Sequence, residues 1–177
     1  GSNPKWSPSS KKGAYVQEDE NGKSPIYVNN LSKESVTKIT NFKDNVEDFS
    51  WSPDGEYFAF AAFQEYEDDW IIEIPGKIEG NEYNWTEEPK VITTMHWRAD
   101  GVGELESGEN HLYLVNSSGG AAIKVSEWGL DYIADLQWLN NFQLLFSGND
   151  SLDDLQTPWK QSGVFLLKIR KKTLEKH

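Results

Sequence analysis

The sequence contains no cysteine, no long apolar run and few basic residues. Without cysteine there is no disulfide scaffold, no thiolate nucleophile and no cysteine-based metal site, which fits a reducing compartment. No apolar run approaches the ~20 residues of a membrane-spanning helix. The 17 lysines and arginines are outnumbered by 29 acidic residues, for a formal net charge of −12. This balance argues against nucleic-acid binding, which needs a basic stripe, and against an anionic membrane surface.

Motifs for catalysis and cofactor binding are also missing. The sequence has no Gly-x-Ser-x-Gly nucleophile elbow, no His-Glu-x-x-His zinc motif and no glycine-rich phosphate loop. Among the histidines, His96 and His111 are expected to be structural or solvated, and His177 is terminal. We therefore predict no catalytic residue, no metal ligand and no cofactor in this chain, and its substrate-binding residues stay unassigned.

A tryptophan-led turn recurs along the sequence. In its clearest copy, residues 51–55 read Trp-Ser-Pro-Asp-Gly, in which Pro presets φ, the Asp side chain caps its own backbone and Gly takes a positive φ. Residues 57–63 after this turn are apolar or aromatic throughout. We therefore predict a hairpin whose second strand is buried on both faces. Similar units begin at intervals of 45, 46 and 41 residues, at Trp6, Trp51, Trp97 and Trp138.

Short apolar strands follow each tryptophan, and about four antiparallel strands per 40–50 residues are typical of a β-propeller blade. We predict an all-β partial propeller of about three and a half to four blades. Its units are predicted at 1–44, 45–94, 95–130 and 131–177. The alternative fold is an all-β sandwich whose tryptophans are spaced by accident. Gly1-Ser2 is interpreted as a tag remnant, so a signal peptide could have been removed.

An incomplete propeller leaves blade faces without a neighbour. Each blade buries its faces against adjacent blades, and closed rings contain about 4–8 blades. We expect either a tight pseudo-four-bladed closure or pairing of two chains through the open blade faces.

Two acidic clusters flank the outer strands of the second unit, at 65–69 and at Glu87-Glu88. We expect both to be solvated loops at a blade edge, where charge opposes edge-to-edge aggregation. The alternative is a binding loop for a cationic group, such as the amino terminus of a peptide.

Two segments carry a family resemblance. Trp-Ser-Pro-Asp-Gly followed by an aromatic-Ala-Phe strand, at residues 51–60, resembles repeats shared by Tol-type periplasmic propellers and peptidases of the prolyl oligopeptidase family. Residues 89–103, followed by the His-Leu-Tyr strand at 111–115, are similar to the acylaminoacyl-peptidase branch of that family. In that branch a Pro-x-x-Ile-Thr segment leads into Arg-x-Asp-Gly. The resemblance covers nearly the whole chain.

The resemblance implies an amino-terminal propeller that caps an α/β-hydrolase domain with a Ser-Asp-His triad. This chain would then be non-catalytic, and would gate short peptides and dock onto the hydrolase domain of the same polypeptide, a cytoplasmic serine peptidase. No catalytic residue of the family maps onto this sequence. Propeller glutamates hold the substrate's amino terminus in the dipeptidyl branch, but Glu87-Glu88 has a different sequence context and the role is not transferred.

Two other functions remain open. A stand-alone Tol-like propeller would be a protein-protein binding module in the periplasm. A glycosidase or lyase propeller would use carboxylates in its central channel, but no pair can be chosen among 29 acids without geometry.

Overall fold

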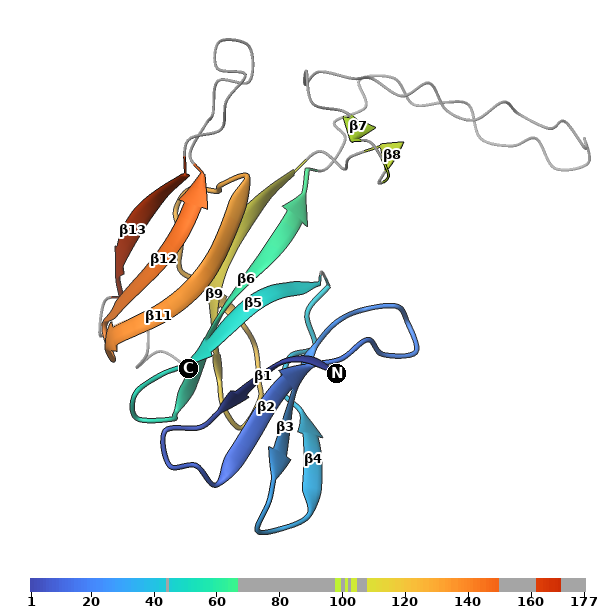
Figure 1. Ribbon diagram of the computed structural model, residues 1–177, viewed down its shortest axis with the longest axis vertical. Helices are drawn as coiled ribbons and strands as arrows, with labels where there is room; N and C mark the ends of the chain where they lie inside the picture. Colours follow the sequence, from blue (N-terminus) through green and yellow to red (C-terminus); the bar gives the residue numbers. More distant parts are fainter. Residues whose placement is uncertain are drawn as a thin grey trace, which may run out of the picture.

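The computed structural model describes residues 1–43, 45–66, 101, 108–149 and 162–169, and the backbone of 98–99 and 103–104. All regular structure in these residues is β-strand, so the all-β prediction is confirmed. The described part of the chain accordingly contains no helix that could span a membrane. Three larger antiparallel sheets follow one another, with the first and third at opposite ends of the series in Figure 1.

The three sheets have the strand arrangement of propeller blades. The first sheet consists of β1 (Ser2–Trp6), β2 (Lys12–Val16), β3 (Ile26–Asn30) and β4 (Ser35–Lys38). The second sheet has the order β5 (Val46–Trp51), β6 (Tyr57–Glu65), β9 (Gly108–Asn116) and β10 (Ile123–Lys124). The third sheet consists of β11 (Tyr132–Asn140), β12 (Gln143–Asn149) and β13 (Ser162–Lys168). β5 contacts both β1 and β11, as the inner strands of consecutive blades do.

The second sheet differs from the predicted division into units. β6 pairs with β9 along its whole length, as far as Glu65 opposite Gly108. The units predicted at 45–94 and 95–130 therefore contribute to one sheet, and the boundary between them is corrected. The chain between Glu65 and Gly108 connects two adjacent strands. A blade can hold such a long connection because the entropy cost of closing a loop grows slowly with its length.

The turn predicted after Trp97 is a hairpin, but it does not begin a blade. It joins β7 (Arg98–Ala99) to β8 (Gly103–Glu104) in a separate two-stranded sheet, and Gly101 between them has φ of 80°. Trp97 itself lies outside the described residues. The described residues thus form three blade-like sheets where four tryptophan-led units were predicted.

The turn between β5 and β6 is held by side-chain hydrogen bonds, as predicted. The Ser52 hydroxyl donates to Asp54 Oδ1 at 2.6 Å and accepts from the Tyr57 amide at 2.9 Å. Asp54 Oδ1 also accepts from the Glu56 amide at 3.0 Å, and Gly55 has φ of 73°. The turn chemistry predicted for residues 51–55 is therefore confirmed.

β6 is buried on both faces, which confirms the prediction for residues 57–63. Phe58, Phe60 and Ala62 pack in the core between the first and second sheets. Ala59 and Ala61 pack in the core between the second and third sheets. The second sheet is therefore covered on each side by another sheet.

The repeated tryptophan joins each sheet to the one before it. Trp51 Nε1 donates a hydrogen bond to the Lys5 carbonyl at 3.2 Å, and Trp138 Nε1 donates to the Ser50 carbonyl at 3.3 Å. Each acceptor directly precedes the tryptophan of the previous sheet. Trp138 therefore contacts the sheet that begins with the Trp51 unit, which agrees with the strand pairing.

The Phe60→Ala substitution should lower the free energy of unfolding by about 3–5 kcal/mol, because a fully buried ring would leave a cavity. The Phe60 ring stacks on Tyr113 at 5.3 Å and meets Phe42 edge-on at 5.5 Å, measured between ring centroids. Urea unfolding measures the loss. The control is Phe142→Ala in the β11–β12 turn, where the ring is exposed and the loss should stay below about 1 kcal/mol. Equal losses in the two variants would contradict this packing.

Candidate functional site

Asp48 on the inner strand β5 connects all three sheets. Its Oδ1 accepts hydrogen bonds from Lys5 Nζ at 2.7 Å and from Asn3 Nδ2 at 2.9 Å, both in the first sheet. Its Oδ2 accepts from the Leu136 amide of β11 at 3.1 Å. Lys5 Nζ also donates to the Phe49 carbonyl and lies 5.1 Å from the centroid of the Phe49 ring. We call Asn3, Lys5, Asp48 and the Leu136 amide the inner-strand network.

The environment of Asp48 favours its ionised form. The side chain is 14% exposed, and burial opposes ionisation. Hydrogen bonds from Lys5, Asn3 and the Leu136 amide outweigh this cost, and they hold the pKa of Asp48 below its ordinary value. The buried charge is thus compensated by one cation and by directed N–H groups, which is the condition under which buried ion pairs persist.

A β-bulge in each inner strand precedes the tryptophan. The ladders of β1, β5 and β11 are all irregular at this point. The residues three positions before the tryptophans are polar in all three strands, namely Asn3, Asp48 and Asp135. Asn3 and Asp135 have positive φ angles of 51° and 55°, in the left-handed region that Asn and Asp tolerate best. Bulges re-aim side chains, and here they bring Asn3 and Asp48 together.

The inner-strand carboxylates have structural partners or are exposed. Both oxygens of Asp48 already accept hydrogen bonds, so this residue is not a free general base. Asp135 Oδ2 accepts from the Ser147 hydroxyl at 2.7 Å. Glu47 is exposed on β5. The described inner strands therefore lend no support to the alternative of a carboxylate-based glycosidase.

A second polar cluster lies on β9. His111 is 7% exposed, with Nδ1 3.2 Å from Ser126 Oγ and Nε2 3.7 Å from Glu109 Oε2. Burial and then the charge of Lys124 lower the pKa of His111, so the imidazole is neutral at pH 7. The structure thus places His111 in the core, in line with the structural role expected from the sequence.

Ser126, His111 and Glu109 have the residue types of a catalytic triad, but their geometry is that of a packing contact. Ser126 is 4% exposed, and its Oγ accepts a hydrogen bond from the Leu112 amide at 3.0 Å. A nucleophile must reach a substrate carbonyl, and this hydroxyl is enclosed. The hydroxyl instead satisfies the backbone of β9.

Tyr66 lies beside this cluster at the end of β6. Burial, followed by the hydrogen bond and negative charge of Glu109, raises the pKa of Tyr66 to about 12. Its phenol is therefore a hydrogen-bond donor at neutral pH. In the described part of the chain, no three His, Asp or Glu side chains gather closely enough to hold a metal ion.

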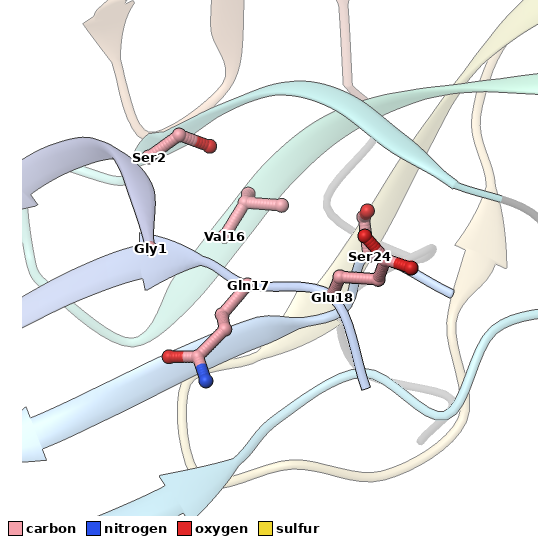
Figure 2. Close-up of a pocket in the computed structure, with 6 residues that line it drawn as sticks. All are labelled: Gly1, Ser2, Val16, Gln17, Glu18 and Ser24. Carbon is pink, nitrogen blue, oxygen red and sulfur yellow. The ribbon is translucent and has the colours of Figure 1, made fainter. Parts of the chain in front are cut away.

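An open hollow of about 370 Å³ lies at the start of the first sheet. It is lined by Gly1, Ser2, Val16, Gln17, Glu18 and Ser24. In Figure 2 the Gln17 carboxamide points away from Ser2 and Val16. Its lining holds one carboxylate, that of Glu18, and no cluster of groups that points to a ligand, so no ligand site is assigned to this hollow.

Most of the other residues singled out in the sequence lie outside the described residues. These are 67–69 of the first acidic cluster, Glu87-Glu88, His96, Trp97 and His177. Sequence reasoning missed the inner-strand network. The signal that could have found it is the polar residue three positions before each repeated tryptophan, namely Asn3, Asp48, Thr94 and Asp135.

Comparison with known proteins gives local and structural likenesses. No family model matches the sequence. The Tol-Pal system protein TolB of Alcanivorax borkumensis is 36% identical over 58 residues, which cover 33% of this chain and 13% of the relative. This match is confined to a small part of both proteins.

Two solved structures share the fold over nearly the whole chain. The acylaminoacyl peptidase of Pyrococcus horikoshii has a TM-score of 0.59 and 16% identity, covering 94% of this chain and 23% of that one. TolB from Acinetobacter baumannii has a TM-score of 0.52 and 16% identity, covering 93% of this chain and 31% of that one. This chain spans less than a third of either protein. The likenesses confirm the β-propeller fold and the predicted resemblance to both groups of propellers.

The Asp48→Asn variant tests the inner-strand network through pH. Since the pKa of Asp48 is lower in the folded chain, the stabilisation from its charge is complete above the ordinary value of 3.8. It is lost as pH falls through the folded pKa. At about pH 6 the variant should be less stable than the parent chain by about 1–3 kcal/mol, and this difference should shrink toward about pH 3.

Urea unfolding at the two pH values measures this difference. Glu47→Gln is the matched control, because Glu47 is exposed on the same strand and should change stability little at either pH. A cost of Asp48→Asn that is the same at both pH values would show that the charge does not stabilise the fold.

Proposed function

We propose that this chain is the non-catalytic propeller portion of a serine peptidase of the prolyl oligopeptidase family. The observation that carries the proposal is the structural likeness to an acylaminoacyl peptidase over 94% of this chain. The sequence supports it independently, because the segment at 89–103 resembles the same branch of the family. The triad would be supplied by an α/β-hydrolase domain of the same polypeptide, onto which the propeller docks.

In this function the blades gate access to the active site. Short peptides would pass to an internal chamber beside the propeller, whereas larger substrates would be excluded. A size filter needs a rigid wall, and two features of the described sheets favour rigidity and so support the proposal. The inner-strand network connects three inner strands, and the tryptophan hydrogen bonds join successive sheets. The propeller would thus act by exclusion and by docking, without contributing a nucleophile.

The full-length gene product tests the peptidase assignment. A fluorophosphonate probe, which labels activated serine nucleophiles, should label the full-length protein and leave the 177-residue chain unlabelled. The full-length protein should also release the chromophore 4-nitroaniline from N-acetyl-alanine 4-nitroanilide. A Ser→Ala change in its Gly-x-Ser-x-Gly elbow should abolish both the labelling and the hydrolysis. A reading frame that carries no such elbow, and a product that the probe does not label, would refute the assignment.

Gating has a separate test in the same full-length protein. Asp48→Asn should raise kcat/KM for a long peptide relative to that for a short one, because the wall becomes easier to deform. The ratio for Glu47→Gln should match the parent protein. An unchanged ratio in Asp48→Asn, with stability lowered as expected, would remove the inner-strand network from the gating proposal.

A binding propeller of the TolB type is the second candidate. The local match to a TolB protein favours it. A reading frame that contains an export signal and only further propeller repeats would support this function over the peptidase. The chain would then serve as a protein-protein binding module in the periplasm.

A further inference from the structure

The loop at 125–131 leads from β10 in the second sheet to β11 in the third sheet, and it is attached to β9 on either side of His111. Its first amide donates to the Leu112 carbonyl at 2.8 Å. Near its other end, Leu130 and Asn110 exchange two backbone hydrogen bonds, at 2.7 and 3.0 Å. We call this segment the crossing loop. Its two attachments flank His111, which is 7% exposed.

The His111 ring contacts the crossing loop directly. Nδ1 lies 3.2 Å from Ser126 Oγ, and the ring also hydrogen-bonds with the backbone of Trp128. Ser126 Oγ already accepts from the Leu112 amide at 3.0 Å, so we assign its own proton as the donor to Nδ1 of a neutral ring. A protonated ring donates from both nitrogens, and the Ser126 proton then loses its acceptor in an enclosed site.

The crossing loop also joins the second and third sheets through Trp128. Its ring lies 6.2 Å from that of Phe146 and 6.0 Å from that of Phe165, measured between centroids. The two phenylalanine rings stack on each other in the core between these sheets. Gly129 lets the loop approach β9 closely, because a Cβ there would lie 2.5 Å from Glu109 Cβ. The position of the crossing loop therefore depends on the β9 side chains that it covers.

In the described part of the chain, two opposite charges act on His111, those of Lys124 on β10 and Glu109 on β9. Glu109 Oε2 lies 3.7 Å from Nε2, and the same side chain also accepts a hydrogen bond from the Tyr66 phenol after β6. Ala62 is the residue of β6 opposite His111 and carries no charge. Burial, followed by Lys124, outweighs the attraction of Glu109, so the pKa of His111 lies below its ordinary value of 6.5. The acidic residues of the crossing loop itself are exposed, namely Glu127 and Asp131.

We propose that protonation of His111 releases the crossing loop from β9, so that mild acid loosens the contact between the second and third sheets at Trp128. The closed loop favours the neutral ring, so its stabilisation is complete above 6.5 and is lost as pH falls toward the lower pKa of the folded chain. Asp48 keeps its charge in this range, because its pKa lies below 3.8. Its hydrogen bond from the Leu136 amide therefore still joins the inner strands when the loop is released.

A nitroxide label on the crossing loop tests the proposal. The chain has no cysteine, so a single Glu127→Cys substitution at an exposed position can be labelled selectively. Electron paramagnetic resonance spectra between about pH 8 and about pH 5 should show the label change from restricted to mobile, with a midpoint below 6.5. The change should be reversible, and circular dichroism should show that the β-sheet signal is kept throughout.

Histidine variants of the labelled chain identify the titrating group. His111→Gln cannot gain the proton and should abolish the pH-dependent change in mobility. His177→Gln is the matched control, because it makes the same substitution at the last residue and should respond as the labelled parent does. Nuclear magnetic resonance of the His111 ring in the labelled parent, with the nitroxide reduced, should give a titration midpoint that matches the midpoint in mobility.

Lys124→Met supplies a test that keeps His111 in place, and it decides the matter if His111→Gln does not fold. Removing the positive charge that opposes protonation should move the midpoint by about 0.5 unit toward higher pH. Lys33→Met is the matched control, because Lys33 is exposed in the β3–β4 turn and should leave the midpoint unchanged.

The proposal would be overturned by a label whose mobility is the same at both ends of the pH range, or by a mobility change that persists in His111→Gln. A midpoint that Lys124→Met leaves in place, or a titration of His111 without any change in mobility, would contradict it equally. The measurements use the 177-residue chain alone, so their outcome is independent of whether the full-length protein is a peptidase.

Discussion

Burial of both faces of the second sheet is the constraint on which the rest of this structure depends. Successive side chains of β6 point in opposite directions, so Phe58 and Phe60 need cover on one side while Ala59 and Ala61 need it on the other. The first and third sheets supply that cover. Each of these sheets then has one buried and one outward face, and the pattern continues until a ring closes or another surface docks.

Polar contacts define how the sheets meet, whereas apolar burial supplies most of the stabilisation. An apolar face alone would tolerate sliding of one sheet over another. The hydrogen bonds of Asp48 and of the tryptophan indoles join particular atoms across the sheets and therefore select one arrangement. The bulges contribute to this selection, because they aim polar side chains along the line of inner strands.

Local features of this fold could be predicted from the sequence, but features that depend on distant pairing could not. The turn at 51–55 and the burial of 57–63 follow from neighbouring residues, so both predictions are confirmed. The boundary near residue 94 was misplaced because a tryptophan followed by an Asp-Gly turn looks the same in two situations. Such a turn can begin a new blade, or it can lie in the connection between two strands of a single blade, as it does after Trp97. Asp48 was missed because its partners come from β1 and β11, and only the packing of strands that are distant in the sequence brings them to its carboxylate.

The long connection between β6 and β9 also has a consequence for biosynthesis. A ribosome adds about 5–20 residues per second, so several seconds separate the emergence of Glu65 from that of Gly108. During this interval the nascent chain exposes an apolar strand whose partner has not yet been made. Such a strand edge can pair with other chains, so translation speed and chaperone binding become determinants of yield for this protein.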